Sequence, residues 1–140
     1  MESQRSLAEM LGSLSLFSDL SHPELEAAAH TFSEAWFAEG QRVLRQGFSG
    51  TAFHLIAAGE AMVRINGKDI VKLGRGDFFG EISILLGEPP TADIVALGPL
   101  HCLTLAGPAT QGFLETYPKV MYRLLQAEAL RLKHTMQWQS

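Results

Sequence analysis

The spacing of apolar residues divides the chain into three zones, and the first of them, residues 1–30, has helical periodicity. Ser21 is followed by Pro23 and Glu24, a pattern typical of a helix start, because serine caps the helix and an acid suits its first turn. The first zone is therefore predicted to consist of helices.

The second zone, residues 31–106, is predicted to be rich in β-strands. Nine of the thirteen glycines fall between residues 40 and 87 and separate short runs, which is typical of antiparallel strands joined by tight turns. Residues 61–65 alternate between apolar and polar side chains, as a strand with one buried face does. Asn66 and Gly67 follow at once, and this dipeptide between two such runs favours a β-hairpin.

The third zone, residues 108–137, returns to helical periodicity, and Pro118 divides it into a short helix and a longer one. Helices, then a run of strands, then further helices indicate an α+β fold whose strands curl into a sandwich or barrel, within one domain spanning residues 1–140. The longer helix carries an apolar stripe made of Met121, Leu125, Ala129, Leu132 and Met136, which Leu124 and Leu130 widen.

Composition and charge narrow the function classes. The chain has 140 residues, of which 46% are apolar and 19% charged, as expected of a globular domain. Its net charge of −4 argues against nucleic acid as a partner. The charge is uneven, because four basic residues and one acidic residue give residues 118–140 a local charge of +3. Such a helix either docks on an acidic partner or membrane surface, or forms a solvated face whose cations suit a helix C-terminus.

No targeting or membrane-inserting segment is predicted. The N-terminus lacks the apolar run of a signal peptide. Residues 94–114 contain no Asp, Glu, Lys or Arg over the length of a membrane span, but Gly-Pro pairs at 98–99 and 107–108 interrupt them. The single cysteine, Cys102, excludes an internal disulfide and is expected to be buried. A cytoplasmic, bacterial-type protein is the simplest interpretation.

The segment with the clearest chemical signature is residues 78–92. Gly80 lets the backbone approach a ligand closely, and a helix that begins at Glu81 offers free N–H groups that suit an anion. The carboxylate of Glu81 can accept hydrogen bonds from sugar hydroxyls. Gly87 then ends the helix, and the two prolines that follow it enforce an extended exit.

This segment resembles the phosphate-binding cassette of cyclic-nucleotide-binding domains, the module of catabolite-activator-type regulators, kinase regulatory subunits and nucleotide-gated channels. The family pattern reads approximately F-G-E-x-[AS]-L-[LI]-x-x-x-P-R-[ST]-A. The resemblance covers nearly all of residues 16–130 and implies an eight-stranded antiparallel β-roll with N-terminal helices, a short cassette helix and C-terminal helices. The flanking stretches that also match, in order, are residues 16–21, 38–47, 53–56 and 59–61.

The resemblance also implies roles for individual residues. Glu81 would bind the ribose 2′-hydroxyl, and Thr91 would contact the phosphate or the base. Trp138, at the end of the last helix, is a candidate lid over the pocket, with a frayed terminal tryptophan as the alternative. The other positions carried over are Gly80, Ile82 and Ser83 around the sugar and phosphate, and Pro90 and Ala92 in the second half of the pattern.

One position departs from the family pattern, because Pro90 stands where the family has arginine. Arginine gives the cyclic phosphate a planar, permanently charged fork, whereas proline has no charge and no donor. Removing one partner of a buried charge pair costs about 2–5 kcal/mol, which corresponds to roughly 30-fold to several thousand-fold in affinity. The resemblance therefore predicts that cyclic AMP and cyclic GMP are not bound in the usual way.

The other charges expected near the phosphate are those of Glu81, Glu88 and Asp93, which would repel it. Rescue of the clamp by Lys72 or Arg75 is the less favoured alternative, because long charged side chains tend to stay in water. No cofactor is therefore predicted, and cyclic AMP or cyclic GMP is expected only if the clamp is rescued.

Structural alternatives accompany the functional roles. Glu81 could act only as an acid in the first turn of a helix, and Ser83 and Thr91 could serve only in caps and turns. His54 has no second ligand at metal-binding spacing, so no metal site is predicted.

The sequence favours a stand-alone regulatory module that acts through protein contacts, either as a homodimer formed through the last helix or on another protein. The alternative is a sensor that binds a cyclic nucleotide or another small molecule through a rearranged clamp. No nucleophile–base pair, metal set or Walker-type loop is evident, so an enzyme is not predicted.

Overall fold

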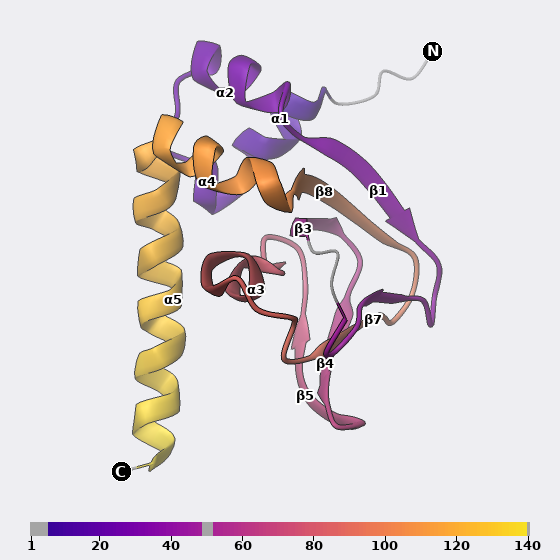
Figure 1. The fold of residues 1–140 in the computed structure, drawn as a ribbon. Coiled ribbons are helices and arrows are strands. Elements are labelled where there is room, and N and C mark those ends of the chain that lie inside the picture. The colour runs from indigo at the N-terminus through magenta and orange to yellow at the C-terminus, as the bar shows by residue number, and fades with distance from the viewer. Residues whose placement is uncertain (1–5, 49–51, 140) are drawn as a thin grey trace.

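The computed structural model describes residues 6–48 and 52–139, with helices at both ends and strands in the middle (Figure 1). In this part of the chain no helix combines the length and the apolarity needed to cross a membrane. The elements are α1 (Leu7–Gly12), the 3-10 turn η1 (Ser15–Phe17), α2 (His22–Ala29), β1 (Ser33–Phe37), β2 (Arg42–Leu44), β3 (Ala52–Ala58), β4 (Ala61–Ile65), β5 (Lys68–Leu73), β6 (Phe78–Phe79), α3 (Glu81–Leu86), β7 (Asp93–Ala96), β8 (Leu100–Ala106), α4 (Gly107–Thr116) and α5 (Pro118–Gln139).

Within the described residues, eight strands form two four-stranded antiparallel sheets that make up a β-roll. The first sheet has the order β1-β8-β3-β6, and the second has the order β2-β7-β4-β5. The last two strands, β7 and β8, each pair between two strands that come earlier in the sequence. Both sheets are therefore completed by the last strands of the chain. The predicted α+β fold and eight-stranded roll are confirmed, while the extent of the domain, residues 1–140, stays a prediction.

Two turns, the first of which the sequence predicts, bring the chain to the cassette, residues 78–92. Asn66 and Gly67 join β4 to β5 with φ angles of 54° and 79°, the positive values that a two-residue hairpin turn requires. After β5 the backbone N–H of Asp77 donates to the Gly74 carbonyl over 3.0 Å, and a carboxylate oxygen of Asp77 accepts from the Gly74 N–H over 2.8 Å. This closed turn leads directly into β6.

Serine caps start the N-terminal helices as the sequence predicts for Ser21. The Ser21 hydroxyl accepts from the Glu24 N–H, and the Glu24 carboxylate accepts from the Ser21 N–H, which completes a capping box. Ser6 and Glu9 make the same pair of bonds at the start of α1. Both helices therefore begin at positions that their own side chains fix.

Two apolar clusters hold the fold together. The larger one lies between the terminal helices and the first sheet, and it contains the rings of Phe17, Phe32 and Phe113, whose centroids are 5.2–6.2 Å apart. The smaller one fills the roll and includes Ile56 and Cys102. Burial raises the pKa of the Cys102 thiol to about 12, so this cysteine is an inert core residue, as the sequence indicates.

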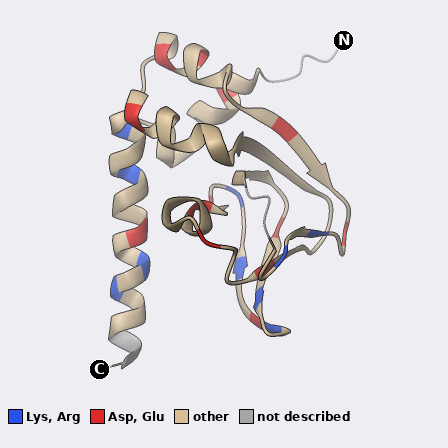
Figure 2. Cartoon of the chain, viewed as in Figure 1, with Lys and Arg blue, Asp and Glu red and all other residues tan. Residues whose placement is uncertain are grey.

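Helix α5 is attached to the rest of the domain at its N-terminal end. Val120 and Leu124 are buried in the larger cluster, so Leu124 faces the core instead of widening the apolar stripe. Arg123 donates two hydrogen bonds to Asp19, of 2.7 and 3.0 Å, and Lys119 lies 3.8 Å from Glu24. Figure 2 shows basic residues in blue along α5 and acidic residues in red on the neighbouring N-terminal helices. Part of the positive charge of residues 118–140 is thus balanced by acidic side chains of the same chain.

The larger cluster should carry much of the stability. We expect Phe17→Ala to lower the free energy of unfolding in urea by about 3–5 kcal/mol, because it leaves a cavity beneath α1, α4 and α5. Phe48→Ala is the control, since the Phe48 side chain is 60% exposed and its loss should change stability by no more than about 0.5 kcal/mol. Equal losses for the two variants would contradict this account of the core.

Candidate functional site

The cassette helix α3 begins at a glycine that no other residue could replace without strain. Gly80 has a φ of 91° and lies so close to β3 that an added Cβ would overlap the carbonyl oxygen of Ala52. Gly87, with a φ of 67°, ends the helix after six residues. The helix is therefore short and firmly seated on the first sheet, and its dipole is correspondingly small.

A cavity of about 820 Å³ lies beside α3, between the roll and the C-terminal half of α5. Its wall is mainly apolar and comes from β4, β5, β7, the cassette and α5. All seven cassette residues named from the sequence line it, and these are Gly80, Glu81, Ile82, Ser83, Pro90, Thr91 and Ala92. The structure thus brings the predicted site residues together, while their roles in binding stay predictions.

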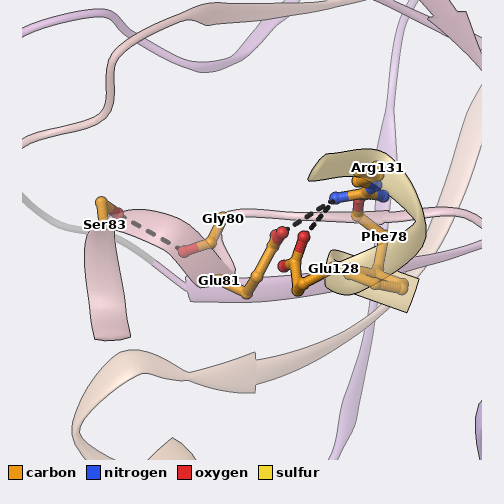
Figure 3. A network of polar contacts seen from close by, with 6 residues as sticks. All are labelled: Phe78, Gly80, Glu81, Ser83, Glu128 and Arg131. Atoms are coloured by element: carbon orange, nitrogen blue, oxygen red, sulfur yellow. Dashed lines mark hydrogen bonds and ion pairs between the residues drawn. The ribbon is translucent and has the colours of Figure 1, made fainter. Parts of the chain in front are cut away.

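Glu81 is the most deeply buried of the charged groups in this wall, with 2% of its side chain exposed. Its carboxylate accepts a hydrogen bond of 2.9 Å from Arg131 of α5, and the same nitrogen donates to Glu128 over 3.3 Å (Figure 3). Arg131 also donates to the Phe78 carbonyl over 3.2 Å, and its guanidinium lies 4.4 Å from the centre of the Phe78 ring. One arginine therefore fastens α5 to the cassette through three contacts, one to Glu81 and two to Phe78.

The expectation that only acidic groups lie near the site is wrong, because Arg131 lies in the wall and Glu88 and Asp93 do not. Glu88 is exposed, and Asp93 accepts a hydrogen bond of 2.7 Å from the backbone of Gln46. The sequence signal for Arg131 was its helical phase, since residues 120, 124, 127 and 131 lie on one face of α5 and the first three pack inward.

The pKa of Glu81 is raised to about 8. Burial is the main cause, because it disfavours the charged form, and the facing carboxyl of Glu128 adds to it through a hydrogen bond and through charge repulsion. Arg131 and a backbone hydrogen bond act in the opposite direction and lower it. Burial and the facing Glu128 therefore favour the protonated form of the Glu81 carboxyl, whereas a first-turn helix position favours the ionised form.

Pro90 forms a buried part of the wall where the family pattern has arginine. Its carbonyl accepts a hydrogen bond of 2.8 Å from the Gly47 N–H. This bond ties the end of the cassette to the segment that follows β2, a strand of the second sheet. Thr91 is exposed and Ala92 is half-buried, and neither side chain is ionisable. Ser83 uses its hydroxyl on the Gly80 carbonyl, over 3.4 Å, as the structural alternative for this residue predicts.

The two residues named as substitutes for the clamp lie differently. Arg75 does not line the cavity and donates a hydrogen bond of 2.9 Å to the hydroxyl of Ser13. Lys72 does line it, but its ammonium group lies 3.8 Å from Glu60 and its side chain is 55% exposed. Rescue through Arg75 would therefore require that side chain to leave its partner and cross to the cavity.

The remaining candidate residues belong to the scaffold or lie outside the description. His54 is buried, bonds to the Thr104 hydroxyl over 3.0 Å and stacks on Phe79, and burial lowers its pKa to about 4. Among the described residues no group of three or more His, Cys, Asp or Glu side chains could hold a metal ion. Trp138 lies in the last turn of α5, but its side chain is outside the described residues, so its role as a lid stays a prediction.

Comparison with known families decides what this arrangement is. Residues 34–117 match the family described as the cyclic nucleotide-binding domain. The chain belongs to this family. Membership fits the roll, the glycine-seated helix α3 and the cavity beside it, and it confirms the resemblance seen in the sequence.

One relative of this cyclic-nucleotide-binding-domain protein is a cGMP-dependent protein kinase from Eimeria tenella. The two sequences are 29% identical over 132 residues, which cover 92% of this chain and 13% of the kinase. The catabolite activator protein of Thermus thermophilus is 27% identical, with a TM-score of 0.78 over 87% of this chain and 60% of that chain. The regulatory domain of Toxoplasma gondii PKA, crystallised with cAMP, is 22% identical, with a TM-score of 0.75 over 89% of this chain and 49% of that chain.

The last of these likenesses concerns the fold alone, and the chain spans only a small part of the curated kinase. The relatives come from eukaryotes and from a bacterium, so the bacterial origin expected from the sequence stays a prediction.

The seat of α3 can be tested with a pair of glycine substitutions. Gly80→Ala and Gly87→Ala both place an alanine at positive φ, which costs about 1–2 kcal/mol of unfolding free energy. We expect the loss for Gly80→Ala in urea unfolding to be clearly larger, because its Cβ also meets the Ala52 carbonyl, whereas Gly87 has open space around it. Losses of the same size would show that α3 is not seated as described.

Proposed function

We propose that this chain is a regulatory domain whose pocket does not bind cyclic AMP or cyclic GMP in the family's usual way, and whose output is a protein contact. Pro90 carries the proposal, because this buried residue occupies the place of the family's arginine and offers neither charge nor donor. We propose a regulatory rather than a catalytic role, in the cytoplasm.

The charges around the cavity support this proposal. Three side chains in its described wall can carry positive charge, and they are Lys72, Arg131 and His134. Arg131 is engaged with two carboxyl groups and a carbonyl, and Lys72 lies beside Glu60. A cyclic phosphate would therefore have to break existing contacts to gain an arginine or lysine partner, and it would meet the acidic Asp77 in the same wall.

A sensor for a small molecule is the second candidate, because the cavity is large enough for one. A volume of about 820 Å³ lies within the usual range of ligand pockets, and the wall combines apolar surface with a few polar groups. In this case Lys72 would supply the clamp after leaving Glu60.

Restoring the arginine tests the proposal. We expect Pro90→Arg to raise the affinity for cyclic AMP at least about 10-fold over the unsubstituted chain in titration calorimetry, because a guanidinium at this position faces the cavity. Pro90→Gln is the matched control, since it releases the same ring constraint without adding charge, and we expect no gain from it.

Two outcomes would contradict the proposal. Equal gains for the two substitutions would show that the ring, and not the missing charge, limits binding. No gain for Pro90→Arg would show that the cassette itself, and not the clamp, is what excludes the ligand. Circular dichroism and unfolding curves of both variants separate these outcomes from misfolding.

We further propose that the outer face of α5 is the protein contact and that its partner is a second copy of this chain. This face carries three large apolar side chains that point away from the domain, and Met121, Leu125 and Leu132 are 40%, 62% and 60% exposed. Their spacings of four and seven residues place them along one seam of a helix pair. A self-complementary apolar seam on a long helix suits a two-fold symmetric dimer.

The dimer can be tested by sedimentation velocity on the full chain of 15.3 kDa. We expect the unsubstituted chain to sediment as a dimer and Leu125→Glu to sediment as a monomer, because a charge at the seam faces its own copy. Leu130→Glu is the control, since Leu130 is similarly exposed, at 53%. The 3.6-residue repeat of the helix puts Leu130 on the side opposite Met121, so it lies off the seam and does not widen the apolar stripe as the sequence suggested. A monomeric unsubstituted chain, or equal effects of both substitutions, would contradict the proposal.

A further inference from the structure

The contact between α5 and the cassette contains an unusual pair of groups, because it brings two carboxyl groups together on one arginine. Glu81 comes from α3 and Glu128 from α5, and both accept a hydrogen bond from the same Arg131 nitrogen, over 2.9 and 3.3 Å (Figure 3). One guanidinium balances one of the two carboxylates, so the cluster holds one excess negative charge when both acids are ionised.

One oxygen of this cluster has no hydrogen-bond donor among the described residues. The Oε2 atom of Glu128 is buried and lacks a partner in that part of the chain, although its carboxyl faces that of Glu81. A buried carboxylate oxygen without a donor is costly, since the water that would solvate it has been removed. A proton held between the two carboxyls supplies the missing donor and removes the excess charge at the same time.

We propose that Glu81 and Glu128 share one proton and that this acid pair holds the C-terminal half of α5 on the cassette. Glu128 then binds the carboxyl group of Glu81, which is the group that the family pattern assigns to a ligand's sugar. A ligand hydroxyl that needs an ionised Glu81 must displace Glu128 first, so release of α5 and access to Glu81 are coupled. This inference concerns the α5 contact and does not depend on whether a cyclic nucleotide binds.

The raised pKa of Glu81, about 8, supports the geometry and fixes the direction of the pH dependence. A carboxyl whose pKa is higher in the docked state than in the released state takes up a proton on docking. Its contribution to docking is therefore full below its ordinary pKa of 4.5, is lost progressively as the pH rises toward about 8, and is absent above that. We expect α5 to dock more firmly in mild acid than in mild alkali.

Other charged groups lie near the pair. On α5 itself His134 lines the same cavity, and across it lie Asp77 and Lys72, the latter beside Glu60. The strand beneath α3, β3, contributes His54, whose ring is bonded to Thr104.

The packed helix α4 carries one acid, Glu115, which accepts from Gln111 over 3.1 Å. Arg131 is thus the only basic side chain hydrogen-bonded to the pair among the described residues.

Carboxyl-carbon NMR of the full chain labelled at glutamate tests the acid pair. Between about pH 4 and about pH 10 we expect one glutamate signal to titrate with a midpoint near 8, far above the ordinary range. The backbone amides of Ala127 and Thr135 in α5 should shift with that same midpoint, because docking follows the proton.

Glu128→Gln is the decisive variant, since its amide can donate to an ionised Glu81. We expect it to lower the midpoint of Glu81 by about one pH unit or more, while burial keeps that midpoint above 4.5. Glu39→Gln is the matched control, since Glu39 is exposed and lies on the loop after β1. It should leave the midpoint unchanged.

Three results would overturn the inference. Titration of every glutamate below about pH 5.5 would exclude a shared proton. An unchanged midpoint in Glu128→Gln would show that burial alone holds the proton. Amides of α5 that do not follow the midpoint would show that the proton does not control docking. The first and third results come from the unsubstituted chain, so they stand even if a variant misfolds.

Discussion

Burial of the Glu81 carboxyl against α5 connects the three parts of this domain. Glu81 is held in place because α3 starts at Gly80, whose missing side chain allows the close approach to β3. Arg131 reaches the carboxyl from α5, which is anchored a few turns earlier by Leu124 in the core and by the ion pair of Arg123 with Asp19. Roll, cassette and terminal helices therefore meet at one buried carboxyl group. We expect a change in the charge of this group to affect all three.

The contacts of Glu81 also affect which ligands the cavity favours. The family pattern places an arginine at the phosphate, whereas the corresponding position here is the apolar ring of Pro90. Arg131, the arginine that lines the described wall, is engaged with Glu81 and Glu128. Among the described side chains of the wall, an anionic ligand would find both the arginine and the lysine engaged, and to bind Arg131 it would have to compete with contacts that hold α5 in place. The proposed loss of the usual clamp and the docking of α5 are thus consistent with each other.

The roll, its turns and the cassette could be predicted from the sequence because their signals are local. Asn66 with Gly67 and the glycines at 80 and 87 act through backbone geometry that few other residues allow. The roles of the α5 residues could not be predicted in this way. Its sequence offers two apolar faces, and the more apolar one, containing Leu125 and Leu132, faces outward, because packing against η1 and α4 selects the face with Leu124. The contact of Arg131 was not predicted either, because its partner Glu81 lies 50 residues away in the chain.

The central claim concerns the phosphate, and the most direct test is titration calorimetry of the unsubstituted chain with cyclic AMP and with cyclic GMP at neutral pH. The account predicts no saturable heat in the micromolar range, because Pro90 leaves the phosphate without its clamp. A one-site isotherm with a micromolar or lower dissociation constant would contradict it, and would show that Lys72 or another group takes the place of the missing arginine.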